Sequence, residues 1–450
     1  MPGLLGPGEI KDVAEAALDV SGVDGVEVLF MHEWGGLSRF ADSSIHQSTW
    51  REDTSLRVRV VTKGRVGVAS TNQLGTESAK RIAESAKEMA AVASPDPLFP
   101  GLAPKAVVPD RTEAFDEETA NVTPEDRAER IASLVSQCGD GFHAAGALDT
   151  TAAEIALVNS EGQFCYSPYT QAMITTVVSG GDGGAGYAES WAKTYDELDV
   201  DAVGKRAAEK ARDSQNPRDL EPGHYEVVLE PAAVGTLIAF LAYMGFGGRA
   251  LLEGRSCFSG REDEQVGSEA VTIVDDALSS DTIGLPFDFE GTPKKRVEMI
   301  TRGVFRSAVY DRRSARQAGI ESTGHALPPP NPEGPFPLNV TFEPGAASTE
   351  EMIAATGRGL LVTRFHYSNI VHPMESVITG MTRDGTWLIE NGRLMHPVKN
   401  FRFTQSIIEA LKETSLVGSE TEMVSEFFFA ASRVPGLKVD RFHFTGKSDH

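Results

Sequence analysis

Two kinds of hydrophobic spacing alternate along the first half of the chain. Ile10–Val20 and Glu77–Ala93 carry apolar residues at helical intervals, which predicts two amphipathic helices. Val26–Glu33, Leu37–Trp50 and Thr54–Thr71 instead alternate apolar and polar positions, which predicts strands. The first part of the chain is therefore expected to combine helices with a sheet.

Cap and turn residues extend this prediction. Thr123, followed by a proline and two acids, is typical of the first residue of a helix. Lys63-Gly64 predicts a hairpin turn, Ala152–Ser179 predicts two further strands, and Val200–Ala211 predicts another helix.

A change of composition indicates two domains. The polar, proline-containing segment Arg212–Tyr225 is typical of a boundary. We therefore expect an α+β fold class, with an N-terminal α/β domain over residues 1–215 and a β-rich C-terminal domain over residues 222–450. In the second domain, Ala232–Gly248 is apolar but short for a membrane span, which predicts a helix buried in the protein.

Two dipeptides that are typical of tight turns occur in the last part of the chain. Asp384-Gly385 and Asn391-Gly392 separate the β-like runs SVITGMT, TWLIE and RLMHPV. Such pairs supply the positive φ angles that tight hairpins require. The pattern predicts an antiparallel meander.

Composition and charge exclude several classes of partner. The chain has 450 residues, 40% of them hydrophobic, and a formal net charge of −23. An acidic protein of this kind is not expected to bind nucleic acid or an anionic membrane surface. The cysteines Cys138, Cys165 and Cys257 form no CxxC pair, and no signal peptide is apparent, so we expect reduced thiols in the cytoplasm.

Two partial motifs do not support the chemistry that they suggest. Gly181, Gly183 and Gly186 match GxGxxG, but YAESWAKTY follows them and favours a strand, where a dinucleotide site needs a helix. A glycine-rich hairpin is the better interpretation. His32-Glu33 lacks a second histidine one turn later, where Gly36 stands, so no metallopeptidase helix is expected there.

Three histidines, His366, His372 and His396, raise the question of a metal site. Side chains six apart in a regular strand share a face, as His366 and His372 would. However, Pro373 restricts His372, and the Ser-Asn pair between the two histidines suggests a bend. A metal site is the less favoured interpretation, because neither ligand number nor geometry supports it.

Four blocks carry a family resemblance along nearly the whole chain. In order they are LSRFADSSIHQSTWREDTSLRVRVVTKGRVGVAS, FSGREDEQVGSEAVTIVDD, PFDFEGTPKKRVEMITRGVF and ATGRGLLVTRFHYSNIVHPMESVITGMTRDGTWLIENGRLMHPVKNFRFTQSI. Together they resemble the TldD/PmbA family. The resemblance implies an α/β domain followed by a β-rich domain, and an intracellular zinc-dependent peptidase system that acts on small proteins or unfolded peptides. That system is often a heterodimer of a TldD subunit and a TldE (PmbA-like) subunit.

The chain departs from the TldD type at the metal helix. That type carries a HExxxH helix and a late cysteine. Counted back from Phe258, the helix falls on TLIAFLAYMGF, where Ala239 and Met244 hold the histidine positions and Phe240 the glutamate position; no cysteine follows Cys257. A zinc hydrolase needs ligands and a base for the bound water, and these side chains supply neither.

The resemblance therefore implies a TldE/PmbA-like subunit that pairs with a TldD-like catalytic chain. We expect no catalytic residue and no cofactor in this chain, with zinc in the partner subunit. Candidate peptide contacts are Arg364, His366, His372, Gly181 and Gly183. Two alternatives stay open: a stand-alone metal-dependent hydrolase built on His366, His372 and His396, and a homodimeric peptide-binding protein without peptidase activity.

Overall fold

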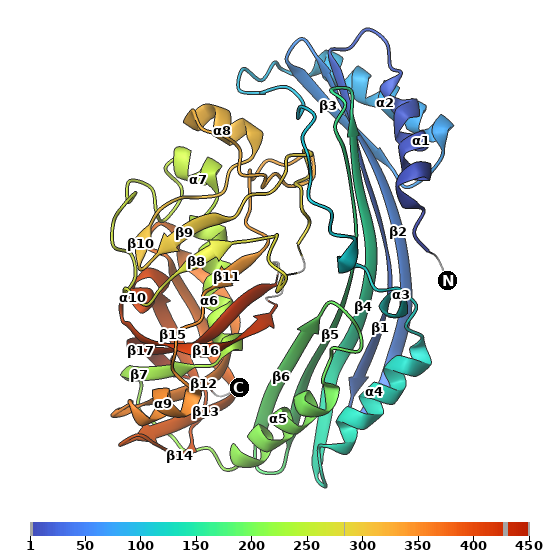
Figure 1. Cartoon of the computed structure of the whole chain (residues 1–450). Helices are drawn as coiled ribbons and strands as arrows, with labels where there is room; N and C mark the ends of the chain where they lie inside the picture. Colours follow the sequence, from blue (N-terminus) through green and yellow to red (C-terminus); the bar gives the residue numbers. More distant parts are fainter. Residues whose placement is uncertain (1–2, 283, 426–430, 449–450) are drawn as a thin grey trace.

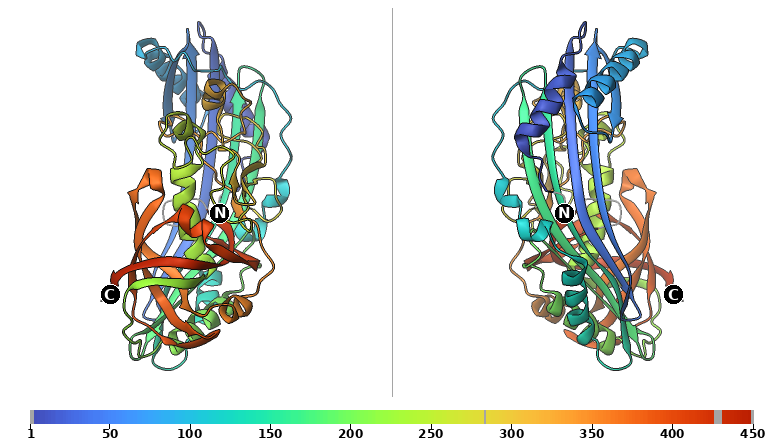
Figure 2. Two further views of the ribbon diagram at one scale, coloured as in Figure 1. Left: turned by 90° about the vertical axis from the view of Figure 1, so that its left-hand side faces the viewer. Right: turned by 90° about the vertical axis from the view of Figure 1, so that its right-hand side faces the viewer.

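Two β-sheets divide the chain. The computed structural model describes residues 3–282, 284–425 and 431–448. One sheet contains only strands from residues 25–192, and the other only strands from residues 223–447. The first sheet is long and curved, and the second half of the chain packs along it (Figure 1). Two side views show that its longest strands extend along most of the length of the molecule (Figure 2). The expected α+β fold class is confirmed, with one antiparallel and one mixed sheet.

The first sheet is entirely antiparallel. Its strands in spatial order are β3 (Arg65–Thr71), β2 (Ser44–Thr62), β1 (Gly25–Ala41), β4 (Phe142–Asn159), β5 (Phe164–Gly180) and β6 (Gly184–Ala192). The predicted strand Leu37–Trp50 is wrong, because a turn at Asp42 and Ser43 divides it. Both residues take positive φ angles, which a tight turn between twisted strands requires and which Asp tolerates.

Helices cover one face of this sheet at its two ends. The helices of the first half are α1 (Gly6–Leu18), α2 (Thr76–Val92), α3 (Glu117–Ala120), α4 (Pro124–Ser136) and α5 (Val200–Asp213), with a 3₁₀ turn η1 (Thr112–Ala114). Val28 and Phe30 pack under α1 and α2, whereas Leu29 between them faces Phe287 and Phe289 of the second half. Successive side chains of β1 are thus buried on opposite faces of the sheet. The predicted cap at Thr123 is confirmed as a reciprocal capping box with Asp126.

The second sheet closes on itself around an apolar core. The strands of the second half are β7 (Gly223–Leu229), β8 (Ile273–Asp275), β9 (Val297–Thr301), β10 (Val304–Phe305), β11 (Val340–Phe342), β12 (Arg358–His372), β13 (Val377–Glu390), β14 (Arg393–Pro397), β15 (Phe401–Ser406), β16 (Thr414–Val424) and β17 (Ser432–Lys447). Because β7 pairs with both β12 and β17, the strands β7, β12, β13, β15 and β17 form a ring. Its helices are α6 (Pro231–Gly245), α7 (Gly248–Leu252), α8 (Arg312–Ala318), α9 (Thr349–Ala354) and α10 (Ile407–Lys412), with a 3₁₀ turn η2 (Pro373–Glu375).

The turn dipeptides have two different outcomes. Lys63-Gly64 joins β2 to β3, and Asn391-Gly392 joins β13 to β14, so both predicted hairpins are confirmed. The hairpin predicted at Asp384-Gly385 is wrong, because β13 continues through it. Both residues have positive φ angles, and the register with β12 shifts there, so this pair forms a bulge instead of a turn.

The three cysteines carry free thiols. Cys138, Cys165 and Cys257 are free and buried, as expected, and burial raises the pKa of Cys165 and of Cys257 to about 12. Across the part of the chain that the structure describes, no helix has both the length and the apolar character to cross a membrane.

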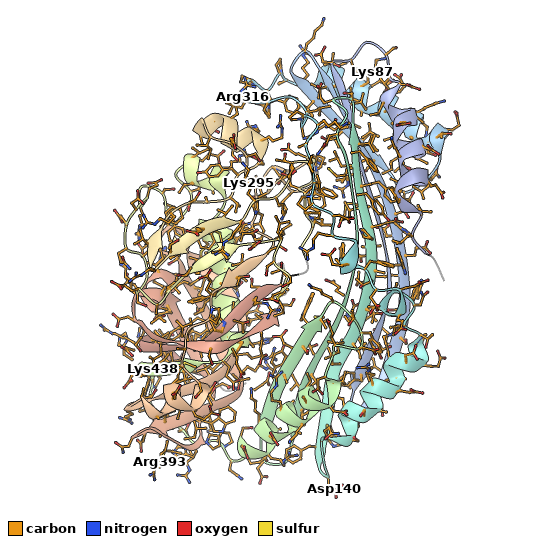
Figure 3. All side chains as sticks on the ribbon, in the orientation of Figure 1. Lys87, Asp140, Lys295, Arg316, Arg393 and Lys438 are labelled. Carbon is orange, nitrogen blue, oxygen red and sulfur yellow. The ribbon has the colours of Figure 1, made fainter. Side chains whose placement is uncertain are left out.

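Side chains of the two halves meet between the sheets, at a surface that we call the junction (Figure 3). Its apolar part is the cluster around Leu29. Much of the rest is charged: Arg59 contacts Glu290 at 3.1 Å, and Arg206 contacts Glu422 at 2.7 Å. The junction therefore combines a small apolar contact with ion pairs, as is usual between domains of one chain.

Candidate functional site

Helix α6 lies at the centre of the second half. Leucine and alanine are strong helix formers, and Pro231 at its first position removes an amide that would have no partner inside the helix. The helix packs on β12 and β17, and it buries side chains around most of its circumference, among them Leu237, Ile238 and Leu241. An apolar helix of this kind belongs to a protein core.

A groove of about 540 Å³ opens at the carboxyl end of α6. The side chains that line it are mostly apolar: Tyr243, Met244, Leu327, Pro335, Phe336, Ile370, Pro373 and Met374. Arg255 and Glu333 are its charged lining residues. Tyr243 is 52% exposed and Met374 44% exposed, so apolar surface extends from the groove into solvent. A groove of this size and character is typical of a site for an apolar side chain.

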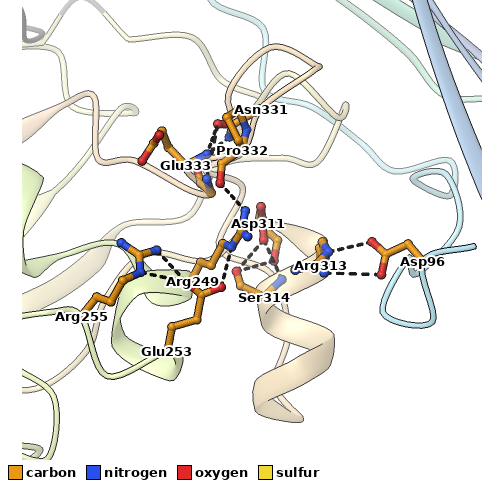
Figure 4. Close-up of polar contacts among 11 residues, drawn as sticks. Asp96, Arg249, Glu253, Arg255, Asp311, Arg313, Ser314, Asn331, Pro332 and Glu333 are labelled. Carbon is orange, nitrogen blue, oxygen red and sulfur yellow. Dashed lines mark hydrogen bonds and ion pairs between the residues drawn. The ribbon is translucent and has the colours of Figure 1, made fainter. Parts of the chain in front are cut away.

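The proline-rich segment 328–337 forms one wall of the groove. Asn331 holds it in a tight turn by donating from Nδ2 to the carbonyl oxygen of Gly334 at 2.7 Å. Arg249 of α7 donates to the carbonyl oxygen of Pro332 and pairs with Glu253 at 2.8 Å (Figure 4). The hydrogen bonds from Arg249 and Arg255 lower the pKa of Glu253. The segment is therefore fixed in place beside the groove.

Family models match the chain over nearly its whole length. The PmbA/TldA metallopeptidase C-terminal domain matches residues 222–446, the central domain residues 103–215, and domain 1 residues 26–90. This chain belongs to the PmbA/TldD metallopeptidase family. The resemblance of the four sequence blocks to this family is thus confirmed.

Individual relatives agree with this membership. A metalloprotease of Methanothermobacter thermautotrophicus is 25% identical over 62% of the chain, and the match spans 65% of that protein, just under two thirds. Metalloprotease PmbA of Escherichia coli O157:H7 is 23% identical over 96% of both chains. The crystal structure of TldE from Thermococcus kodakarensis has a TM-score of 0.88 at 20% identity and covers 97% of this chain and 100% of that one. At this identity the structural likeness shows the fold alone.

The positions that are expected, by counting back from Phe258, to correspond to a TldD-type metal helix lie in or against the core. Ala239 and Met244 are each 3% exposed, and Phe240 is half-buried against the same apolar cluster. Zinc takes cysteine, histidine or carboxylate ligands, which none of these side chains provides. The residues present on α6 therefore do not fit a zinc ion, and no carboxylate stands there to act as a base.

One of the predicted peptide contacts on β12, Arg364, is held by other residues of the protein, and a second, His366, is half-buried. Arg364 donates from Nε to Asp384 Oδ2 at 2.6 Å, and its guanidinium lies 4.2 Å from the ring of Tyr187 in the first half. His366 is half-buried, and burial together with the charges of Arg383 and Arg364 lowers its pKa. Arg364 thus joins the two halves. A role for either residue in peptide contact stays a prediction.

The three histidines of the alternative metal site are not brought together. His366 lies opposite Met381 of β13 and exposed His372 opposite Val377, so the two are roughly 13 Å apart along the strand at about 3.3 Å per residue. His396 lies on β14, which pairs with the other end of β13, and its Nδ1 contacts a backbone carbonyl oxygen at 3.1 Å. Within residues 3–282, 284–425 and 431–448, no three His, Cys, Asp or Glu side chains could hold a metal ion. The rebuilt histidine site is therefore wrong.

Gly181 and Gly183 lie away from the groove. They form the turn between β5 and β6 with φ angles of 58° and 85°, which glycine adopts without strain. The Gln215 side chain at the end of α5 donates to the carbonyl oxygen of Gly180 at 3.1 Å. The hairpin interpretation of the glycine motif is confirmed. The two glycines do not share a site with His366 or His372.

Sequence reasoning did not identify the residues that line the groove. Tyr243, Phe336, Ile370 and Met374 come from three segments that are distant in sequence. Their common signal is weak: each is a large apolar residue that closely precedes or follows a glycine or a proline, where an element ends. Such positions often stay partly exposed, but their assembly into one groove depends on the tertiary fold.

Proposed function

We propose that this protein is a TldE/PmbA-like, non-catalytic subunit of a two-chain peptidase. It pairs with a TldD-like zinc peptidase and holds peptides or small unfolded proteins for the partner's active site, in the cytoplasm. The observation that carries the proposal is the apolar, core-packed state of Ala239, Phe240 and Met244 in a metallopeptidase family member. A chain without zinc ligands and a base requires another chain for metal-dependent hydrolysis.

Strand β12 supports the peptide-holding part of the proposal. It pairs with β7 only over Gly359–Val362, and beyond that point its ladder partner among the described residues is β13 alone. One edge of the segment Arg364–His372 is therefore unpaired in the described structure. Extended peptides bind such edges through backbone hydrogen bonds, which tolerate varied sequences. Ile370, which lines the groove, lies in the same segment.

Exposed apolar side chains around the groove support the pairing part. Tyr243 and Met374 line the groove, and Val371 stands next to it, 42% exposed. Apolar surface that is contiguous with a groove is typical of protein contact sites. A second copy of this chain could also cover it, so self-association is one of the outcomes that the assembly experiment distinguishes.

Zinc content and assembly test the proposal together. The chain purified alone should carry much less than one zinc per chain, show no peptidase activity, and form a complex with a TldD-like chain in size-exclusion chromatography with light scattering. Tyr243→Ser with Met374→Ser should weaken that complex by roughly tenfold or more, because apolar contacts at an interface centre carry most of its energy.

Met395→Ser is the matched control. Met395 is 54% exposed on β14 and does not line the groove, so this variant should pair normally. Stoichiometric zinc with peptidase activity in the lone chain would overturn the proposal. A stable homodimer that excludes the TldD-like chain would replace it with the homodimeric peptide-binding protein.

A further inference from the structure

A second cavity, of about 400 Å³, lies in the junction at the amino end of α6. The first half contributes β6 and α5 to its wall, and the second half contributes α6, α9, β12, β16 and β17. Unlike the groove at the other end of the helix, most of its lining residues are polar or charged. Its volume is in the range of sites for small molecules.

The amino end of α6 faces this cavity without a side-chain cap. Pro231 and Ala232 line it, and the N-cap residue Glu230 makes no capping hydrogen bond. The Glu230 carboxylate instead pairs with Lys210 of α5. The first turn of a 15-residue helix carries partial positive charge. Pro231 has no amide hydrogen, and Ala233 and Val234 donate to the carbonyl oxygen of Glu230. The amide of Ala232 is therefore the donor that this turn can offer to an outside acceptor. This end of the cavity therefore favours a ligand oxygen.

Thr363 provides an independent sign of a ligand. It is 1% exposed, it lines the cavity, and its Oγ1 has no hydrogen-bond partner among the described residues. The neighbouring side chain of Val362 belongs to the apolar core, so Thr363 points to the opposite face of β12, where Met352 lines the same cavity. Buried hydroxyls nearly always have a partner. A ligand in the cavity would supply one.

The charges around the cavity leave an excess of carboxylates. Its two cations are engaged: Arg206 pairs with Glu422 at 2.7 Å, and Lys210 with Glu230. Glu350 and Glu420 also line the cavity, are exposed, and form no ion pair within the described ranges. An unpaired carboxylate beside a cavity attracts a cation. The cavity lining thus combines a donor at the start of α6 with the unpaired carboxylates of Glu350 and Glu420.

We propose that this cavity binds the α-amino end of a peptide or a free amino acid. The ammonium group faces Glu350 and Glu420. The adjacent carbonyl or carboxylate oxygen accepts hydrogen bonds from the Ala232 amide of α6 and from the Thr363 hydroxyl. Because both halves of the chain line the cavity, the ligand bridges the junction. This site is separate from the groove and does not depend on pairing with a second chain.

Calorimetric titration of the full-length chain tests the ligand class. L-alanyl-L-alanine and its C-terminal amide should both bind, whereas N-acetyl-L-alanyl-L-alanine, which lacks the ammonium group, should not. L-alanine separates the two sources: equal binding of alanine indicates an amino acid, and much weaker binding indicates a peptide end. The proposal fails if none of the amino compounds binds at millimolar concentration, or if the acetylated dipeptide binds equally well.

Variants test the location. Thr363→Val keeps the side-chain shape and should weaken dipeptide binding by roughly tenfold, as expected for one lost hydrogen bond in a buried site. Glu350→Gln with Glu420→Gln should weaken it at least as much. Glu209→Gln, on the exposed side of α5 and outside the cavity, is the matched control and should bind normally. Unchanged binding in both cavity variants, with thermal unfolding confirming that they fold, would place the ligand elsewhere.

Discussion

The two ends of α6 face cavities of opposite character. At the carboxyl end lies an apolar groove of about 540 Å³, and at the amino end a charged cavity of about 400 Å³. The helix itself is apolar throughout, and Tyr243 is one of its few exposed side chains. The difference must therefore come from the elements around the helix. An apolar helix thus borders two different cavities, because its ends fix what the neighbouring loops and strands enclose.

The origin of the difference lies in which half of the chain closes each cavity. The groove is enclosed by the second half alone, whose apolar core continues into it. The charged cavity is closed from the other side by α5 and β6 of the first half. Surfaces that two domains bring together keep more polar character than a core that folds as one unit. The comparison predicts different responses to mutation in the core, in the charged junction and at its exposed edge.

The largest effect is expected where α6 crosses the core. Leu241 is fully buried, so Leu241→Ala should lower the free energy of unfolding by about 4 kcal/mol through lost burial and a new cavity. Tyr243→Ala, two residues further on the same helix, should cost much less, since half of that side chain is already exposed. Denaturant unfolding of both variants measures the contrast. Equal losses of unfolding free energy would mean that the carboxyl end of α6 belongs to the core and does not form a binding site.

The next effect concerns the charged junction and depends on pH. Glu27 is buried beside Arg59, 2.6 Å away, and burial raises its pKa from 4.5 to about 7 despite that ion pair. The folded protein therefore keeps a proton that the unfolded chain has released, so stability falls as pH rises from about 4.5 to about 7. A shift of this size corresponds to about 3 kcal/mol.

Glu27→Gln removes this titration while keeping the shape of the side chain. The unfolding free energy of the variant minus that of the wild type should increase by about 3 kcal/mol between pH 4.5 and pH 8. Other titrating groups that behave alike in the two proteins contribute equally to both unfolding free energies, so their contributions cancel in this difference. A difference independent of pH would show that Glu27 is ionised in the folded state throughout, and that the junction tolerates charge better than its burial indicates.

The sequence predicted the core more fully than the sites. Ala232–Gly248 reads as a buried helix because nearly every position is apolar, and α6 confirms it. Turn residues were less decisive. Asn391-Gly392 and Asp384-Gly385 both allow positive φ angles, but only the first is a hairpin. A dipeptide specifies a local conformation, whereas the choice between a turn and a bulge depends on whether the partner strand continues past it.

Local sequence patterns do not predict which residues line the two cavities. The sequence pattern places Thr363 in a β-like run and Lys210 in a helix. They line one cavity only because β12 and α5 meet across the junction, 153 residues apart in the chain. His366 and His372 show the converse, since a regular strand would have placed both on one face. The bulges at His366–Asn369 and Ile370–His372 remove that regularity.

The smallest effect is expected at the exposed edge of the junction. Arg313 of α8 donates to Asp96 of the first half at 2.7 Å, with about a third of each side chain exposed (Figure 4). The hydrogen bond from Arg313 and its charge lower the pKa of Asp96, although partial burial opposes them. Water screens such a pair, so a double-mutant cycle of Arg313→Met and Asp96→Asn should give a coupling of at most about 1 kcal/mol. The pair Arg302–Glu269, whose side chains are 72% and 77% exposed, is the matched reference and should give less. A coupling of about 3 kcal/mol between Arg313 and Asp96 would mean that water is excluded from this pair. The charged junction would then be a rigid contact as far as its exposed edge.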